Sequence, residues 1–446
     1  MPPPGNAAYI GAVTTTPAAS TALLTDHYEL TMLQAALRSE AAHRRCVFET
    51  FTRRLPEGRR YAVLAGTGRV LDALADFRFG AAEVEDLRRR QVVDDATCDW
   101  LADYRFTGDI SGYAEGDCFF PGSPVLVVES SFAEGVVLET LVLSILNHDS
   151  AIASAASRMT TAAGDRPCIE MGSRRTHEEA AVASARAAYL AGFATTSNLE
   201  AGRRYGVPTA GTSAHAFTLL HDSERDAFAA QLAALGSGTT LLVDTYDVPE
   251  AVRTAVELAG PELGAVRLDS GDLLAQAREV RAQLDELGAT KTRIVVTSDL
   301  DEYAIAALAA APVDAYGVGT ALVTGSGFPT SSMVYKLVAR EGASGELEPV
   351  AKKSKDKKSV GGRKWALRRR GASGRAEAEI VGIGEQPHDD GDDRALMVEL
   401  VRDGERVDHS TLDDARARHD RALDELPRQA LQLQRGEPCI PTIYQE

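Results

Sequence analysis

One histidine lies where a short apolar run ends and a helical pattern begins. His215 follows Gly211, Thr212 and Ser213, and an amphipathic stretch continues after it. Small residues at such a turn let backbone amides approach a phosphate, and the start of a helix favours negative charge. An imidazole at this position can act as a nucleophile or as an acid–base group. The alternative is a histidine with a purely structural role at a helix start.

Two arginines follow another apolar run of the same kind. Arg174 and Arg175 come shortly after Gly172. A pair of guanidinium groups suits a carboxylate or a phosphate, because each group can bind a planar anion through two parallel hydrogen bonds. For at least one of the two, a salt bridge on a helix surface is the alternative.

Carboxylates end two further runs. Asp269 and Ser270 follow Arg267 and Leu268, and Asp299 follows the next run along the chain. Such carboxylates can bind sugar hydroxyls or a metal ion, but they can also simply cap helices.

A glycine-bearing turn completes the set of candidate phosphate contacts. Gly317 and Gly319 allow the backbone to approach a phosphate closely, and Thr320 adds a hydroxyl. Together with the histidine turn and the paired arginines, this turn predicts a ribose-phosphate substrate. No histidine, cysteine or acid cluster has the spacing of a metal site, so we expect Mg²⁺ only as an ion carried by phosphates.

The elements that position these residues alternate between strand and helix. From residue 167 to 320, seven short apolar runs each end in polar or glycine residues and are followed by a helical stretch. This alternation predicts a parallel sheet, and polar residues at every strand end are typical of the active-site face of a TIM-like α/β barrel. A doubly wound open sheet is the competing architecture. The run Gly317–Gly319 is too short and too late to be a dinucleotide fingerprint.

The remaining chain divides around this barrel. We expect a disordered tail at 1–22, an N-terminal α/β part at 23–130, the barrel domain at 131–330, and a C-terminal part at 331–446 that packs with the N-terminal one. A long helix is predicted from about 134 to 162 and another from about 412 to 433. The C-terminal part contains a basic loop, 351–375, which is a candidate polyphosphate contact although most charge runs are merely solvated.

Composition excludes several classes of protein. The formal net charge of −17 argues against nonspecific nucleic-acid binding, and no apolar run is long enough for a membrane helix. The five cysteines are scattered without a CxxC pair, which indicates reduced thiols and a cytoplasmic protein.

These motifs, taken as an ordered set, resemble those of the nicotinate phosphoribosyltransferases. The set comprises Thr25-Asp26-x-Tyr28, Glu170-x-Gly172-x-Arg174-Arg175, Gly211-Thr212-x-Ala214-His215, Arg267-Leu268-Asp269-Ser270-Gly271-Asp272 and Gly317-Val318-Gly319-Thr320. The resemblance implies the type II phosphoribosyltransferase fold, an irregular α/β barrel beside an α/β sandwich built from both chain ends. It also implies a homodimer whose active sites are completed across the interface.

The resemblance also implies roles for individual residues. His215 matches the histidine that ATP phosphorylates, and Tyr28 matches an aromatic residue, with Asp26 nearby, that one subunit places on the pyridine ring in the other. Arg174 and Arg267 match arginines near the pyridine carboxylate. The other matches are Asp269 and Asp299 near the ribose, Gly317, Gly319 and Thr320 at the 5′-phosphate, and Lys353, Lys357 and Lys364 in the loop for pyrophosphate or ATP.

Three positions bear on substrate choice and loop contacts. Met171 stands where the family often has a phenylalanine that stacks on the ring, and Gly361 stands where a proline is common in the basic loop. Ser197 aligns with an aspartate of the related nicotinamide enzymes, and a neutral side chain suits an acidic substrate because it does not repel a carboxylate.

The expected reaction therefore joins nicotinate to phosphoribosyl pyrophosphate, giving nicotinate mononucleotide and pyrophosphate with ATP as the coupled cofactor. A nicotinamide or quinolinate phosphoribosyltransferase is the alternative within the same fold. An aldolase would need a Schiff-base lysine at a strand end, but Lys291 is the only lysine between residues 167 and 320 and it precedes a strand. A non-catalytic sensor would not need so many polar strand ends.

Overall fold

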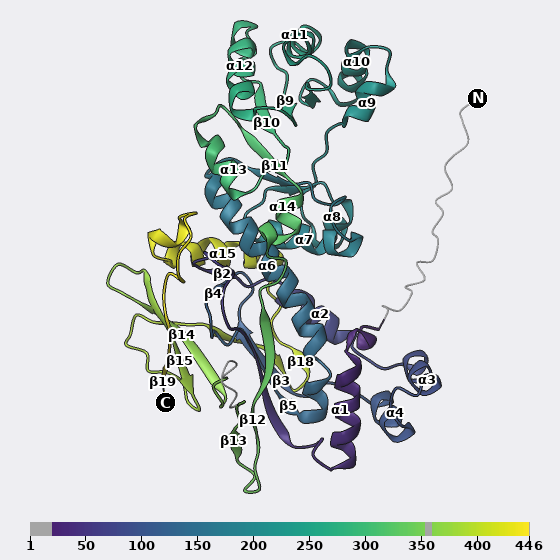
Figure 1. Cartoon of the computed structure of the whole chain (residues 1–446), viewed down its shortest axis with the longest axis vertical. Coiled ribbons are helices and arrows are strands. Elements are labelled where there is room, and N and C mark those ends of the chain that lie inside the picture. Colours follow the sequence, from purple (N-terminus) through teal and green to yellow (C-terminus); the bar gives the residue numbers. More distant parts are fainter. Residues whose placement is uncertain (1–19, 353–358, 446) are drawn as a thin grey trace, which may run out of the picture.

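The computed structural model describes residues 20–352 and 359–445, with a parallel sheet and its helices at one end and largely antiparallel sheets at the other (Figure 1). Most of the expected tail, and Lys353 and Lys357, lie outside the described residues. The tail prediction is wrong for residues 20–22. Thr21 donates a hydrogen bond to the Ala73 carbonyl, and buried Ala22 begins the 3₁₀ helix η1 (Ala22–Leu24).

Six parallel strands form the sheet in the order β7-β6-β11-β10-β9-β8. Their bounds are β6 (Cys168–Glu170), β7 (Thr195–Thr196), β8 (Thr240–Leu242), β9 (Ala265–Leu268), β10 (Arg293–Val296) and β11 (Ala315–Val318). The strands follow one another around the sheet in chain order, and the first strand, β6, lies beside the last, β11. A barrel produces this arrangement, whereas a doubly wound sheet reverses direction from a central strand. The barrel prediction is therefore confirmed.

The sheet is curled but open along one side, so the expectation of a closed ring of strands is wrong. The third predicted strand, at residues 207–209, contributes a single bridge, between Thr196 and Thr209, and no ladder joins it to β8. Pro208 lacks an N–H group and so cannot donate to such a ladder. We call this opening between residues 207–209 and β8 the seam.

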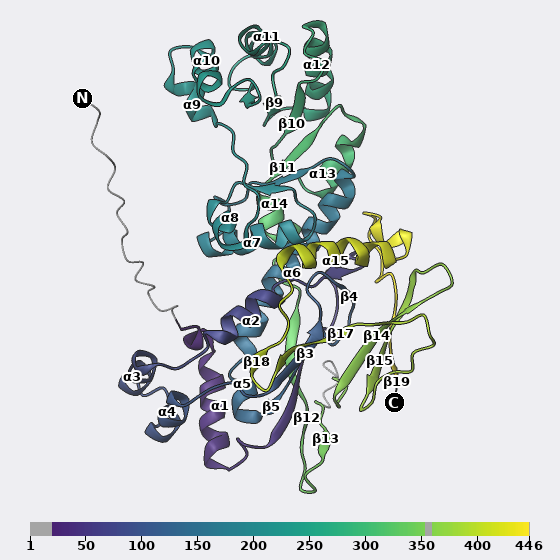
Figure 2. The same cartoon turned by 180° about the vertical axis from the view of Figure 1, so that it is seen from behind.

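Helices follow the strands around the outside of this sheet (Figure 2). They are α7 (Glu178–Leu190), α8 (Leu199–Tyr205), α9 (His215–Leu220), α10 (Glu224–Leu235), α11 (Val248–Ala259), α12 (Leu273–Glu286), α13 (Glu302–Ala307) with η2 (Leu308–Ala310), and α14 (Thr320–Val323) with η3 (Gly325–Gly327). The strands are almost entirely buried and rich in Val, Ile and Leu, as parallel strands covered on their outer face must be.

Both chain ends contribute strands to one antiparallel sheet, in the order β13-β12-β1-β5-β3-β17-β18. These strands are β1 (Arg45–Thr52), β3 (Asp109–Tyr113), β5 (Leu126–Ser131), β12 (Met333–Glu341), β13 (Leu347–Pro349), β17 (Met397–Arg402) and β18 (Glu405–Arg406). Helices of this half are α1 (His27–Arg38), α2 (Thr67–Ala75), α3 (Ala81–Arg89), α4 (Asp95–Ala102) and α5 (Phe132–Val136). The interleaved pairing confirms a sandwich built from both ends of the chain.

Two smaller sheets complete this half. One has the order β16-β14-β15-β19 and the other pairs β2 with β4. Their bounds are β2 (Ala62–Val63), β4 (Cys118–Phe119), β14 (Lys364–Arg370), β15 (Ala376–Ile383), β16 (Arg394–Ala395) and β19 (Thr442–Gln445).

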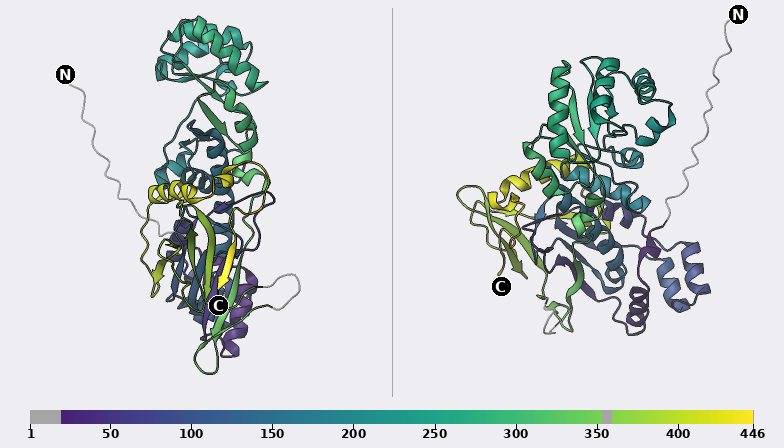
Figure 3. Two further views of the ribbon diagram at one scale, coloured as in Figure 1. Left: turned by 90° about the vertical axis from the view of Figure 1, so that its left-hand side faces the viewer. Right: turned by 45° about the horizontal axis from the view of Figure 1, so that its top comes forward.

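Helix α6 (Glu139–Ala163) connects the two halves, which lie one above the other in an elongated chain (Figure 3). Its first turns bury Leu141 and Leu146 in the core of the sandwich, and its later turns bury Ile152 and Met159 in the core of the barrel. One helix therefore contributes to both cores. The predicted domain boundary near residue 131 precedes this helix, whose residues belong to both halves.

Two predicted helices are interrupted. The helix expected from about 134 divides into α5 and α6 around Val137 and Leu138. The last helix ends earlier than predicted, as α15 (Leu412–Glu425), and is followed by η4 (Arg428–Leu431). Pro427 explains the second interruption because it forces the preceding residue out of the helical region. None of the helices within the described ranges has the length and apolar character to cross a bilayer.

The expected basic loop is partly a strand. Lys364 and Arg368 belong to β14 and are buried, each against a carboxylate. The Lys364 Nζ atom lies 2.5 Å from Glu49 of β1, and the Arg368 Nη2 atom lies 2.7 Å from Glu379 of β15. The prediction that Lys364 binds pyrophosphate is therefore corrected: its ammonium group is enclosed in an ion pair that fastens the C-terminal part to the N-terminal sheet.

The Arg368–Glu379 pair should carry much of the stability of this half. Arg368→Met leaves the fully buried Glu379 without its cation, so we expect the free energy of unfolding to fall by about 3–5 kcal/mol in urea titration. Arg402→Met, which breaks an exposed and solvent-screened pair with Glu399, should cost much less. Equal losses in the two variants would contradict this account.

Candidate active site

A polar cleft of about 200 Å³ lies at the carboxyl ends of the central barrel strands. Its lining comprises Met171, Arg174, Arg175, Arg267, Asp269, Thr297, Ser298, Asp299, Gly317, Gly319 and Thr320. Eight of these residues were predicted from sequence as site residues. The structure thus brings residues that are up to about 150 positions apart in the chain to one edge of the sheet, as the parallel arrangement requires.

Arg174 and Arg175 are exposed at the cleft. Neither guanidinium forms a salt bridge with a carboxylate of the described residues. Two uncompensated cations at one edge of the cleft are therefore available to an anionic ligand.

Arg267 is the most connected side chain of the cleft. Its Nε atom donates to the Thr297 hydroxyl at 3.0 Å, and its Nη1 atom donates to the Thr212 hydroxyl at 3.1 Å and to the Ser213 carbonyl at 3.2 Å. Its Nη2 atom lies 3.3 Å from Asp269. Thr212 and Ser213 belong to the turn before His215, so one buried guanidinium connects strands β9 and β10 to the loop across the seam.

His215 faces the carboxylates of the strand ends. Its Nδ1 atom lies 3.0 Å from the Thr245 hydroxyl, and its Nε2 atom lies 3.9 Å from Asp269 and 4.0 Å from Asp244. The side chain is 41% exposed, so the ring is held from one side and open on the other. An imidazole with one nitrogen anchored and the other accessible can act as a nucleophile.

Asp244 is a site residue that the sequence prediction omitted. Its side chain is only 2% exposed, and its Oδ2 atom accepts hydrogen bonds from the Asp269 amide and the Ser270 hydroxyl, each at 2.8 Å. Its Oδ1 atom is buried without a hydrogen-bond partner in the described chain. The position, directly after a strand, was the available signal. Ser270 therefore orients Asp244, and its hydroxyl is already committed within the protein.

Ser298 was also omitted, and its backbone is strained. Its φ of 115° lies in the left-handed region that an L side chain rarely adopts. Such strain persists where the surroundings impose it, and it is common at binding sites.

Glycines at the cleft serve different purposes. A Cβ atom on Gly317 would lie 2.5 Å from Thr297 and 2.8 Å from Met171, so only glycine fits there. At Gly319 the nearest atom would be 3.5 Å away, which leaves the backbone open to a ligand. Gly172 does not line the cleft, and a Cβ atom there would meet Val323 at 2.2 Å, so this glycine is needed for packing.

Three predicted contacts lie away from the cleft within one chain. Ser197 is exposed at the end of β7. Asp26 caps α1, its carboxylate accepting from the His27 amide at 2.7 Å, and Tyr28 is 43% exposed on the same helix. Figure 1 shows α1 in the sandwich, well below the strand ends. Any contact of Tyr28 with a barrel site therefore requires a second chain.

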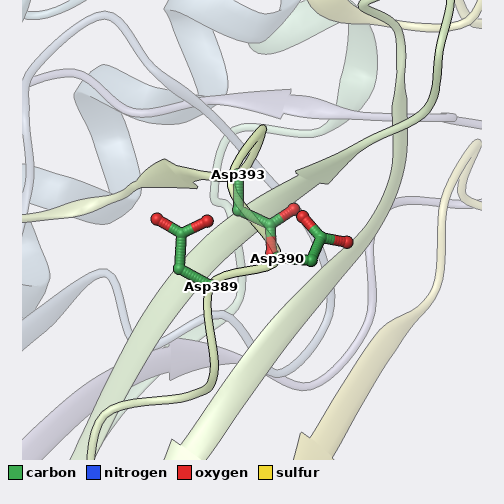
Figure 4. A group of neighbouring side chains, drawn as sticks. All are labelled: Asp389, Asp390 and Asp393. Carbon is green, nitrogen blue, oxygen red and sulfur yellow. The ribbon is translucent and has the colours of Figure 1, made fainter.

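Three carboxylates come within 4.8 Å of one another elsewhere, at Asp389, Asp390 and Asp393 (Figure 4). The Arg369 guanidinium lies 3.3 Å from Asp390 and 3.0 Å from Asp393. Since this cation already holds two of the three carboxylates, the group is explained by an ion-pair network on the sandwich.

Glu224 lies in the first turn of α10, with its Oε1 atom buried and without a hydrogen-bond partner in the described chain. Burial and the carboxylates of Asp247, Asp244 and Glu250 raise the pKa of Glu224 to about 7. Between about pH 4.5 and pH 7 the folded chain thus holds a proton that the unfolded chain has released, so this group makes stability fall as pH rises through that window.

Glu224→Gln should remove this pH dependence. At pH 8 we expect the variant to be about 1 kcal/mol more stable than the wild type after allowance for solvent screening, and near pH 4.5 the difference should vanish. Urea unfolding across this pH range measures it. Exposed Glu279 supplies the control substitution to Gln, and an unchanged pH slope in Glu224→Gln would refute the assignment.

Comparison with known proteins identifies the family. The nicotinate phosphoribosyltransferase N-terminal domain model matches residues 23–147, and the nicotinate phosphoribosyltransferase family model matches residues 167–368. Nicotinate phosphoribosyltransferase pncB1 of Mycobacterium tuberculosis is 59% identical over 434 residues, covering 94% of each chain. The enzyme of Bacillus subtilis is 35% identical, covering 87% of this chain and 79% of its own.

A solved structure agrees with these relatives. The crystal structure of human nicotinic acid phosphoribosyltransferase superposes with a TM-score of 0.80 at 27% identity, covering 95% of this chain and 98% of the human one. The architecture described above is thus the type II phosphoribosyltransferase fold, and the chain belongs to the nicotinate phosphoribosyltransferase family.

Proposed function

We propose that the protein transfers the phosphoribosyl group of phosphoribosyl pyrophosphate to nicotinate, forming nicotinate mononucleotide and pyrophosphate for NAD biosynthesis. The observation that carries this proposal is the composition of the cleft in a chain of this family. Two free arginines, a glycine turn open to phosphate and carboxylates suited to a ribose diol line one cavity.

The cleft suits the charges that develop in this reaction. Breaking the bond at the anomeric carbon builds positive charge on the sugar and negative charge on the departing pyrophosphate. Asp269 and Asp299 supply negative charge beside the sugar, and Arg174 and Arg175 supply positive charge for anionic groups. The pyridine nitrogen has a free lone pair and needs no general base, so orientation supplies much of the remaining rate.

ATP coupling through phosphorylation of His215 is the second part of the proposal. The support is the exposed Nε2 face of a ring that is anchored through Nδ1. Phosphorylation would add nearly two negative charges to the turn that Arg267 holds, so it would alter the contacts of that turn. Mg²⁺ carried by the phosphates suits the buried and unpartnered Asp244 oxygen together with Asp269, and when bound it would neutralise phosphate charge.

The proposal extends to a homodimer with shared active sites in the cytoplasm. Tyr28 and Met32 are exposed on α1, and Leu219 and Leu220 are exposed on α9 beside the histidine. Apolar side chains on both faces suit an interface in which α1 of one subunit reaches the barrel opening of the other. All five cysteines are free, which suits a reducing compartment.

An aldolase-type mechanism finds no support in the structure. Lys291 is 79% exposed in the side chain and lies before β10, at the end of the strand opposite the cleft. No other lysine occurs between residues 167 and 320.

Product formation from labelled nicotinate and phosphoribosyl pyrophosphate, with and without ATP, tests both parts of the proposal. The wild type should convert nicotinate and should not convert nicotinamide or quinolinate at a comparable rate. His215→Ala should lose ATP hydrolysis while keeping a slow synthesis that ATP does not accelerate. His221→Ala, at the other end of α9, should retain full coupling.

The outcomes separate the two parts. Preference for nicotinamide or quinolinate would reject the substrate. Full ATP stimulation in His215→Ala would reject the phosphohistidine and leave the transfer reaction standing.

A further inference from the structure

A second cavity, of about 270 Å³, lies between the barrel and the sandwich. Residues of α6, α13, η3 and the segment around Arg59 line it, and none of its lining residues also lines the strand-end cleft. The segment after β10 contributes Asp299 to the cleft and Asp301 to this cavity. The segment after β11 contributes Thr320 to the cleft and Ala321 to this cavity. The two cavities are therefore neighbours with separate walls.

Two buried guanidinium groups and one buried carboxylate lie at this cavity. Arg59 is 5% exposed, Arg158 is 6% exposed and Glu302 is 3% exposed. The Arg158 Nε atom lies 3.0 Å from one Glu302 oxygen, and the other Glu302 oxygen accepts from the Ser326 hydroxyl at 2.7 Å. Both Glu302 oxygens are thus in use, and Arg59 forms no salt bridge in the described part of the chain.

The donors of Arg59 are mostly unused. Its Nη2 atom donates to the Gly325 carbonyl at 2.7 Å, and its guanidinium lies 5.6 Å from the Phe328 ring centre. Its Nε and Nη1 atoms donate to no group of the described residues, yet they are not sealed from solvent. Arg59 lines this cavity and a neighbouring one of about 10 Å³, and of the two only this cavity has room for an anion beside these atoms.

The charge on Arg59 persists although its surroundings oppose it. Burial, reinforced by the neighbouring Arg158 and only partly offset by Glu302, lowers the pKa of Arg59 to about 10, so the group remains protonated at neutral pH. A buried cation without a matching anion is costly, and an anion that accepts its free hydrogen bonds recovers that cost.

The other charges at the cavity do not compensate Arg59. Asp301 caps α13, its Oδ1 atom accepting from the Tyr303 and Ala304 amides at 2.9 and 2.8 Å. Glu57 and Arg435 lie 3.4 Å apart at the exposed rim and balance each other. Over the whole lining three cations match three carboxylates, so the one excess positive charge is confined to the buried end, where Arg59 and Arg158 face Glu302 alone.

We propose that this cavity is a second anion-binding site, which takes a phosphate group through Arg59 and Arg158. Arg59 offers Nε and Nη1, and Arg158 offers its Nη1 atom, which makes no hydrogen bond in the described chain. The volume suits inorganic phosphate, pyrophosphate or the terminal phosphates of a nucleotide. The proposal concerns binding alone and does not depend on the proposed function.

A crystal soaked in selenate tests the location, because the anomalous signal of selenium marks each bound anion. The wild type should show a peak within hydrogen-bond distance of Arg59 in addition to any peak in the strand-end cleft. Arg59→Met should lose the first peak and keep the second. A wild-type crystal with a peak in the cleft and none at Arg59 would overturn the proposal.

Calorimetric titrations with inorganic phosphate, pyrophosphate and ATP identify the source of the phosphate. The ligand that occupies the cavity should bind Arg59→Met at least tenfold more weakly than the wild type, with Arg59→Lys intermediate. Arg402→Met removes an exposed cation that lines neither cavity and should leave this binding unchanged. If none of the three ligands binds Arg59→Met more weakly, the site does not exist.

Thermal unfolding distinguishes lost phosphate binding from a loss of fold stability in Arg59→Met. Without phosphate, Arg59→Met should be as stable as the wild type or more so, because the substitution removes an unbalanced buried charge. A variant that loses stability equally with and without phosphate would show that Arg59 only stabilises the fold, and would refute the proposal.

Discussion

The site depends on one buried guanidinium that joins parts of the barrel that backbone hydrogen bonds leave apart. The parallel sheet is open along the seam, and the turn before His215 begins on the far side of that opening. Arg267 donates to Thr297 on one side and to Thr212 and Ser213 on the other, while it contacts Asp269. Side-chain contacts therefore hold His215, Asp269 and the cleft in one arrangement. In a closed barrel a strand ladder would do this.

This arrangement has a chemical consequence. Side-chain hydrogen bonds can change when a charged group is added nearby, whereas a continuous ladder resists such change. A phosphorylated His215 would place its charge beside the turn that Arg267 holds, and near Asp244 and Asp269. The seam therefore offers a physical route by which ATP could alter the substrate cleft.

The sandwich uses charge differently. Lys364 and Arg368 pair with Glu49 and Glu379 in buried positions. The Lys364–Glu49 pair joins strands from opposite ends of the chain, and the Arg368–Glu379 pair joins the neighbouring strands β14 and β15. Part of the basic segment 351–375 therefore stabilises the fold through buried ion pairs. The cavity at Arg59 is the contrasting case, because there a buried cation lacks a carboxylate of its own among the described residues.

The sequence was sufficient to predict the barrel and most of the cleft. Parallel strands place their carboxyl ends on one edge, so Arg174, Asp269 and Gly319 could be grouped from their positions after apolar runs. The role of Lys364 could not be predicted, because its partner Glu49 lies 315 positions away. Asp244 and Ser298 were missed because burial and backbone strain are properties of the folded chain. The seam was missed because the short run Val207-Pro208-Thr209 does not reveal whether its ladder forms.

A double-mutant cycle on Arg267 and Thr212 tests the central claim most directly. The cycle compares kcat/KM for nicotinate mononucleotide synthesis in Arg267→Lys, Thr212→Val and the double variant. If the guanidinium holds the histidine turn across the seam, the two substitutions should be coupled by about 1 kcal/mol or more. Effects that add within about 0.3 kcal/mol would show that Arg267 and the turn act independently, and would contradict the account.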